Sequence, residues 1–218
     1  MASKSGDTTA ESALAETRAW VERAVIGLRL CPYAARAHVG GRVRYVCSAA
    51  RDAEALLQDL AVEIERLKRA PADAVETTLL VHPWALRDFE DYNDFLDVAD
   101  AALDALGARG VLQVASFHPA YRFADADADD IANATNRSPH PLLQLLREAS
   151  VTAAVEAGAD AAAIVAANVR TLQRLGTASW ERLLDACRAA ACEARPPEMP
   201  SPSGTPAPRP RRQPKAPR

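Results

Sequence analysis

The sequence contains no long apolar run, and this absence argues against a segment that spans a bilayer. Its apolar stretches are short, such as the one from Thr78 to Val81, whereas a membrane-spanning helix needs about 20 consecutive apolar residues. The first ten residues are polar and lack the apolar centre of a secretion signal. We therefore expect a protein that works in the cytoplasm without contact with a membrane.

The sequence also lacks the short motifs of the common enzyme classes. It has no glycine-rich phosphate loop, no dinucleotide-binding fingerprint, no serine-hydrolase elbow and no HExxH zinc motif. The four cysteines form neither a CxxC pair nor a Cys/His zinc spacing, so we expect free thiols in a reducing compartment. With 9 glycines the chain is not collagen-like. These absences leave the cofactor unknown and the reaction undefined.

What the sequence does contain is the composition of one globular domain with a distinct tail. Of its 218 residues, 49% are hydrophobic and 25% are charged. The segment 194–218 holds nine of the 15 prolines and a net charge of +5, which leaves −8 on the remainder. Such a segment buries too little apolar surface to fold. We expect disorder over 1–8, a single domain over 9–193 and a disordered Pro/Arg-rich tail over 194–218.

The tail has two interpretations. A basic arm would bind nucleic acid or a protein partner. No aromatic residue stands among its charges to stack on bases, so we favour a solubilising tail and expect no nucleic-acid partner.

Alternating strand and helix patterns predict an α/β fold. Strands are expected at 42–47, 75–81 and 111–117, with amphipathic helices between them. Ser138 and Pro139 indicate the start of a further helix through Leu142, Leu145, Leu146 and Ala149. We expect a small, mostly parallel sheet of three strands, or of four, from a β-α-β-α-β core. An N-terminal helix and a C-terminal group of helices would flank it.

Polar residues gather beyond the carboxyl ends of the predicted strands, where α/β proteins bind ligands. His82 follows the second strand and His118 the third, and a long loop then leads to a polar cluster at the predicted helix start. An imidazole titrates near neutral pH, so His118 is the candidate for acid–base catalysis. Arg137 and the helix N-terminus would hold an anion. The candidates for ligand binding are Tyr121, Asn133, Asn136, Arg137, Ser138, Arg147 and Glu148.

Several of these residues have a structural alternative. Asn136 and Ser138 would then cap the helix, and Arg147 with Glu148 would form an ion pair that holds the helix on the sheet. A metal site made of His82, His118 and His140 is a further alternative, but no short ligand spacing supports it, and we predict no metal site.

Three segments resemble a known protein family. Leu30–Ala34 (LCPYA), Gln113–Tyr121 (QVASFHPAY) and Asn133–Ser150 (NATNRSPHPLLQLLREAS) are similar to the bacterial and plant family called domain of unknown function 1415. The resemblance extends from Leu14 to Gly176. The chain departs from the usual family pattern at Tyr33, His140 and Gln144, whereas the matching positions are His118, Asn136, Arg137, Ser138, Arg147 and Glu148. The resemblance implies a site but no activity, substrate or cofactor.

Two functions fit these observations. In the first, the protein is a small enzyme that acts on an anionic small molecule by acid–base chemistry beyond the strand ends. In the second, it is a non-catalytic module that binds an anionic metabolite or a protein partner there. A deep pocket in which His118 and Arg137 converge on one point would favour the enzyme, and a flat surface with both side chains satisfied internally would favour the module.

Overall fold

The computed structural model describes residues 8–156 and 160–193. The predicted tail, and all of the predicted disordered start except Thr8, lie outside these residues. The described part has the following elements: α1 (Ala10–Trp20), η1 (Val21–Ile26), α2 (Ala34–Val39), β1 (Val43–Cys47), α3 (Ala53–Arg69), β2 (Thr77–Val81), α4 (Phe89–Ala105), β3 (Leu112–Phe117), η2 (Ile131–Asn136), β4 (Leu142–Arg147), α5 (Glu148–Glu156), α6 (Ala161–Leu175) and α7 (Thr177–Glu193).

The four strands form one mixed sheet in the order β1-β2-β4-β3. β1 and β2 pair in parallel, and β4 pairs antiparallel with both β2 and β3. Three strands therefore point the same way, and their last residues, Cys47, Val81 and Phe117, lie in one row with Leu142 at the start of β4. We call this end of the sheet the carboxyl edge. The α/β class, the N-terminal helix and the C-terminal helices are confirmed.

The helix predicted to begin after Ser138 and Pro139 is wrong over residues 142–147, which form the central strand β4. Both faces of β4 are covered: Leu143 and Leu145 contribute to one core and Leu142 to the other. A strand that is buried on both faces is apolar almost throughout, and periodicity alone does not separate it from a buried helix. The helical pattern resumes at Glu148, where α5 begins.

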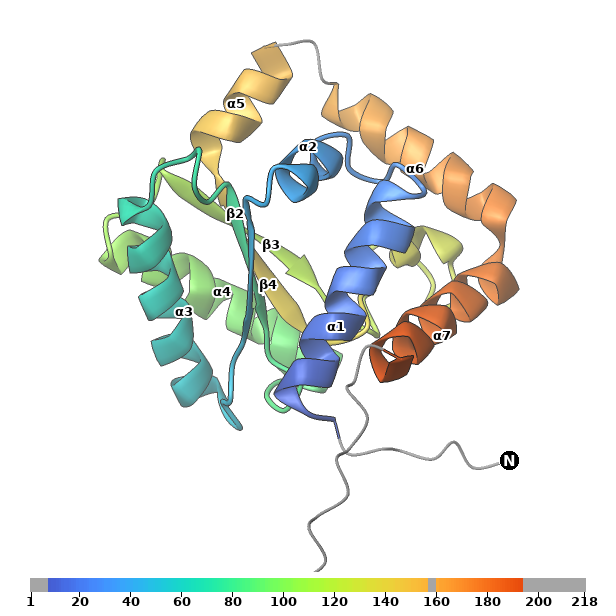
Figure 1. Ribbon diagram of the computed structural model, residues 1–218, viewed down its shortest axis with the longest axis horizontal. Helices are drawn as coiled ribbons and strands as arrows, with labels where there is room; N and C mark the ends of the chain where they lie inside the picture. Colours follow the sequence, from blue (N-terminus) through green and yellow to red (C-terminus); the bar gives the residue numbers. More distant parts are fainter. Residues whose placement is uncertain (1–7, 157–159, 194–218) are drawn as a thin grey trace, which may run out of the picture.

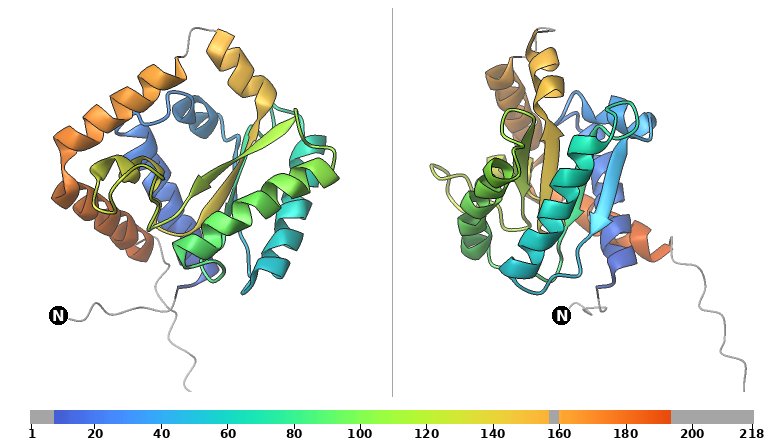
Figure 2. Two further views of the ribbon diagram at one scale, coloured as in Figure 1. Left: turned by 180° about the vertical axis from the view of Figure 1, so that it is seen from behind. Right: turned by 90° about the vertical axis from the view of Figure 1, so that its left-hand side faces the viewer.

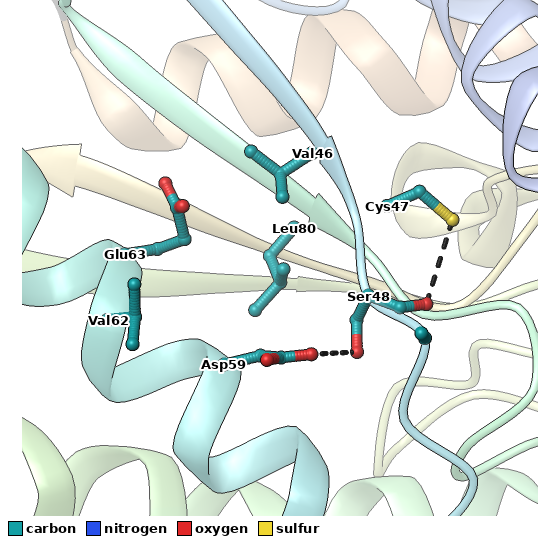
Figure 3. Close-up of a pocket in the computed structure, with 8 residues that line it drawn as sticks. Val46, Cys47, Ser48, Asp59, Val62, Glu63 and Leu80 are labelled. Atoms are coloured by element: carbon teal, nitrogen blue, oxygen red, sulfur yellow. Dashed lines mark hydrogen bonds between the residues drawn. The ribbon is translucent and has the colours of Figure 1, made fainter.

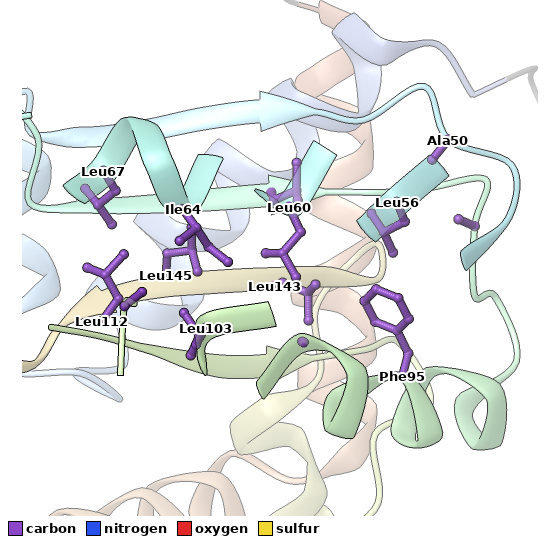
Figure 4. Packing of buried hydrophobic residues seen from close by; sticks show 14 of the residues in the cluster. Ala50, Leu56, Leu60, Ile64, Leu67, Phe95, Leu103, Leu112, Leu143 and Leu145 are labelled. Atoms are coloured by element: carbon purple, nitrogen blue, oxygen red, sulfur yellow. The ribbon is translucent and has the colours of Figure 1, made fainter. Parts of the chain in front are cut away.

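Helices cover the sheet on both faces (Figures 1 and 2). On one face, α3 and α4 pack their apolar stripes on the sheet, as Figure 4 shows. The side chain of Asp52 accepts a hydrogen bond from the backbone of Ala55 and so caps the start of α3. The helix then buries four residues at helical spacing, Leu56, Leu60, Ile64 and Leu67.

α1, α6 and α7 form the layer on the opposite face. Trp20 of α1 is buried there with its ring edge-on to Phe117, 5.5 Å between centroids. No disulfide joins Cys31, Cys47 and Cys187, and the side chain of the fourth cysteine, Cys192, lies outside those that the structure describes. Among the described residues, no helix is both long enough and apolar enough to cross a membrane.

Candidate functional site

The carboxyl edge brings His82 and His118 to the same end of the sheet, as the sequence predicts. Each follows the last residue of its strand, and the pleat turns both side chains toward the α3/α4 face. Their backbones are anchored there: the amide of His82 donates to the carbonyl of Pro141 at 3.0 Å and that of His118 to the carbonyl of Asn136 at 3.1 Å. Because β4 lies between β2 and β3, the two backbones stand roughly 10 Å apart.

Tyr92 of α4 fills the space between the two imidazoles. Its ring stacks on His82 with centroids 5.7 Å apart and lies 5.0 Å from the ring of His118. The Tyr92 hydroxyl donates to the carbonyl of Leu142 at 2.8 Å and accepts from the amide of Phe117 at 2.9 Å. These bonds fix α4 to the ends of β3 and β4. We call His82, Tyr92 and His118 the aromatic stack.

The hydrogen bonds of the two imidazoles are incomplete. Nδ1 of His82 contacts the carbonyl oxygen of Ala85 at 3.1 Å, and Nδ1 of His118 accepts from the amide of Ala120 at 3.0 Å. The Nε2 atom of each ring is buried and has no partner among the described residues. A buried polar nitrogen without a partner is costly, which makes both atoms candidates for contact with a ligand.

Burial also keeps both histidines neutral at pH 7. It lowers the pKa of His82 to about 4, against the opposing effect of the Ala85 carbonyl. The pKa of His118 is lowered as well, mainly by burial, while the carbonyls of Leu86 and Arg87 and the carboxylate of Asp88 act in the other direction. In the neutral state the free Nε2 of His82 retains a lone pair that can accept a proton, whereas the free Nε2 of His118 is an N–H group that can donate to a substrate oxygen, because its lone pair on Nδ1 already accepts from Ala120.

We expect acid to destabilise the protein through His82. Between its ordinary pKa of 6.5 and the folded value of about 4, the unfolded chain takes up a proton that the folded chain does not. The free energy of unfolding should therefore fall as the pH falls through this window, by about 3 kcal/mol from this residue, and be unaffected by it above pH 6.5.

Urea unfolding at a series of pH values measures this effect as the difference between the wild type and His82→Gln. The control is His38→Gln, which removes a partly exposed imidazole beside Glu22. A pH dependence that is the same in His82→Gln and in the wild type would contradict the assignment.

The long loop after β3 returns to the carboxyl edge, and two asparagines hold it in place. Asn133 is buried and accepts from the amide of Phe123 at 3.0 Å while it donates to the carbonyl of Asp127 at 2.7 Å. Asn136 donates to the carbonyl of Ser116 at 3.0 Å. Both side chains therefore stabilise the conformation of the loop through hydrogen bonds to its backbone and to β3.

The remaining candidates of the loop lie close by but do not all face the stack. The Tyr121 ring packs edge-on against Phe89, which in turn lies 5.5 Å from the His118 ring. Ser138 is buried and donates to the carbonyl of His140 at 2.6 Å, so it closes a turn and caps no helix. The predicted helix N-terminus is not there, because β4 follows.

Arg137 is half-buried and binds its own loop. Nε donates to the carbonyl of Tyr121 at 3.1 Å and Nη2 to the carbonyl of Ala128 at 2.7 Å. Burial lowers the pKa of this guanidinium, and no carboxylate of the described residues forms an ion pair with it. The Arg137 guanidinium thus binds carbonyl groups only and forms no ion pair with a described residue.

Arg147 and Glu148 lie at the opposite end of the sheet from His118. β4 runs away from the carboxyl edge, and its five steps from Leu142 to Arg147 span roughly 16 Å. The Arg147 guanidinium donates to the carbonyls of Leu67, Ala70 and Val75 at 2.6–3.1 Å. The expectation that Arg147 and Glu148 lie with the polar loop is wrong. It depended on a helix over residues 142–147, and these residues form β4 instead. The alternative of an Arg147–Glu148 ion pair is not found among the described residues either.

Nothing in the described ranges gathers three His, Cys, Asp or Glu side chains that could hold a metal ion. His140 contacts Glu16 of α1 at 2.9 Å, and Glu16 belongs to the layer opposite the aromatic stack. At His118, the amide that donates to Nδ1 requires the lone pair on Nδ1 and the proton on Nε2. Nε2 is therefore a hydrogen-bond donor in the neutral ring and not a ready metal ligand.

A pocket of about 280 Å³ lies between β1 and α3, beside the carboxyl edge (Figure 3). Its polar groups are already paired: the Ser48 hydroxyl donates to Asp59 at 2.5 Å, and Glu63 binds Arg44 through two hydrogen bonds. Burial raises the pKa of the Cys47 thiol to about 11, which opposes thiolate formation. This pocket offers no activated nucleophile.

The sequence predicts a catalytic role for His118, but it does not identify the other two members of the aromatic stack, His82 and Tyr92. His82 had the same strand-end position and was not chosen as a catalytic candidate. Tyr92 is fully buried on the face of α4 that packs on the sheet. No signal in the sequence places it between two histidines, because that contact joins three separate elements.

Comparison with known proteins supports the resemblance described above. The family model "Protein of unknown function (DUF1415)" matches residues 12–182, which is most of the chain and includes the whole sheet and the aromatic stack. No curated protein and no solved structure is similar enough to match. The chain therefore belongs to the DUF1415 family of proteins of unknown function.

Proposed function

We propose that this protein is a small enzyme that acts on an anionic small molecule by acid–base chemistry at the carboxyl edge. The observation that carries the proposal is the pair of buried imidazoles whose Nε2 atoms have no partner. Buried polar atoms without a partner among the described residues also occur at Trp20, Tyr45, Thr78 and Trp180, but only the two imidazoles are groups that titrate near neutral pH and lie together at the strand ends. His118 is the catalytic residue of this proposal, as its strand-end position predicts.

Arg137 supports an anionic substrate. A half-buried guanidinium without a carboxylate partner leaves positive charge in a medium of low polarity, and an anion that approaches the loop would compensate it. The alternative of a non-catalytic binding module uses the same groups, and the hydrogen bonds of Arg137 within its own loop favour it, whereas the Nε2 atom of His118 is left without a partner in the described part of the chain. The neutral state of both imidazoles favours the enzyme, because neutral rings add nothing to the binding of an anion by charge but can exchange protons.

Incubation of the full-length protein with the acidic fraction of a bacterial cell extract tests the proposal. Mass spectrometry before and after incubation should find at least one acidic compound consumed and one product formed. Compounds that are bound and retained without any turnover would instead identify a binding module.

Arg137→Met should raise the KM for the compound consumed by about tenfold, the value of one charge-assisted hydrogen bond. Arg137→Lys should restore little if the anion is held by two nitrogens at once. The matched control is Arg122→Met, which removes an exposed cation of the same loop. A variant at Arg137 that loses stability but keeps its KM would show that this residue only braces the loop.

A further inference from the structure

The two imidazoles of the aromatic stack have opposite hydrogen-bond partners on Nδ1. The partner of His82 is a carbonyl oxygen, that of Ala85, which can only accept; Nδ1 of His82 must therefore carry the proton. The partner of His118 is a backbone amide, that of Ala120, which can only donate; Nδ1 of His118 must therefore carry the lone pair. The backbone thus dictates a different tautomer for each ring.

These tautomers give the two unpartnered atoms different chemistry. In a neutral ring the second nitrogen has the opposite character to the first. Nε2 of His82 then carries a lone pair and is a hydrogen-bond acceptor, whereas Nε2 of His118 carries a proton and is a donor. Both atoms are buried and have no partner in the described part of the chain. The carbonyls of Leu86 and Arg87 lie near His118, but neither is in position to accept a hydrogen bond from its Nε2.

We infer that His82 is a second ligand-binding residue of this edge, and that the ligand meets a hydrogen-bond acceptor at His82 and a donor at His118. The inference rests on the proposed function and narrows the class of substrate. Since Tyr92 separates the two rings, the two complementary groups stand at opposite ends of the ligand. The ligand carries an O–H or N–H group at one end and an anionic oxygen at the other, as a hydroxy acid or an amino acid does.

The segment from Pro83 to Asp88 connects His82 to α4 and contributes to the surroundings of both rings. Nδ1 of His82 contacts the carbonyl of Ala85, and the carbonyls of Leu86 and Arg87 raise the pKa of His118. Leu86 has a left-handed backbone with φ of 49°, which is uncommon for a residue other than glycine.

Long-range proton–nitrogen NMR of the uniformly ¹⁵N-labelled full-length protein at pH 7 tests the tautomers. We expect the proton on Nδ1 in His82 and on Nε2 in His118. The chain has four histidines, and His38→Gln and His140→Gln identify the other two signals. Contacts with Phe89 then distinguish His118 from His82. The same tautomer in both rings, or a charged ring at pH 7, would overturn the inference.

The ligand class is tested with three probes of equal chain length: 4-hydroxybutyrate, butyrate and succinate. The His82 and His118 signals should respond to 4-hydroxybutyrate at concentrations about tenfold lower than to the others. Butyrate has no donor for His82, and succinate places an acceptor against its lone pair. Succinate binding as well as 4-hydroxybutyrate, or no response to 4-hydroxybutyrate at any concentration, would overturn the ligand class. The tautomer measurement involves no turnover, so its result is independent of whether the protein is an enzyme.

Discussion

Arg147→Ala should destabilise the protein by about 3–5 kcal/mol. The guanidinium donates to three carbonyls, those of Leu67, Ala70 and Val75, and so ties β4 to the end of α3 and to the segment that precedes β2. Alanine leaves these partly buried acceptors without a donor. The positive charge also lies at the negative end of the α3 helix dipole, and this favourable electrostatic interaction is lost as well.

Urea denaturation measures this change, with Arg147→Lys and Arg69→Ala beside it. Lysine keeps the charge but presents one nitrogen where arginine presents a fork, so it should recover part of the loss. Arg69 is an exposed arginine near the end of the same helix, paired with Glu65, and its removal should have little effect. A near-wild-type Arg147→Ala would return this residue to the list of candidates for ligand binding.

His118→Gln should reduce turnover of the acidic substrate by about 10²–10⁴-fold, the usual contribution of an acid–base group. Glutamine keeps a polar side chain of similar size but cannot exchange a proton near neutral pH. The effect should fall on kcat, because the ring's main contribution under the proposed function is to proton transfer.

His140→Gln is the matched control, since this imidazole pairs with Glu16 on α1 and does not belong to the aromatic stack. Its turnover should equal that of the wild type. Comparable turnover in His118→Gln, with an intact fold by circular dichroism, would remove His118 from the chemistry and leave the binding module as the better interpretation.

The positions of His82 and His118 could be predicted because they depend on a local rule. Each ends an apolar strand, and strands joined by helical crossovers run in the same direction, so the ends meet at one edge. The rule holds even though β4 separates the two strands in the sheet. Local patterns alone were enough for this part of the site.

The position of Arg147 could not be predicted, because it depends on whether residues 142–147 form a helix or a strand. The run LLQLLR satisfies a buried strand and a buried helix equally well. Read as a helix, it keeps Arg147 near the polar loop; as a strand, it carries Arg147 to the far end of the sheet. Because a helical period was assigned to a strand, both Arg147 and Glu148 were expected at the wrong end of the sheet. The partners of Tyr92 were beyond sequence reasoning for another reason, since they are set by packing between distant segments.

The central position of β4 also has a consequence for folding. β2 and β3 each need a partner that lies later in the sequence, and the contact between Thr77 and Leu146 closes a long loop. Contacts of large sequence separation slow folding, and a chain emerges from the ribosome with its N-terminal part first. Until the segment up to Arg147 is available, β2 and β3 present unpaired edges. Exposed strand edges of this kind are where incompletely folded chains associate, so the stretch between the synthesis of β3 and that of β4 is the one in which this sheet is most open to incorrect pairing.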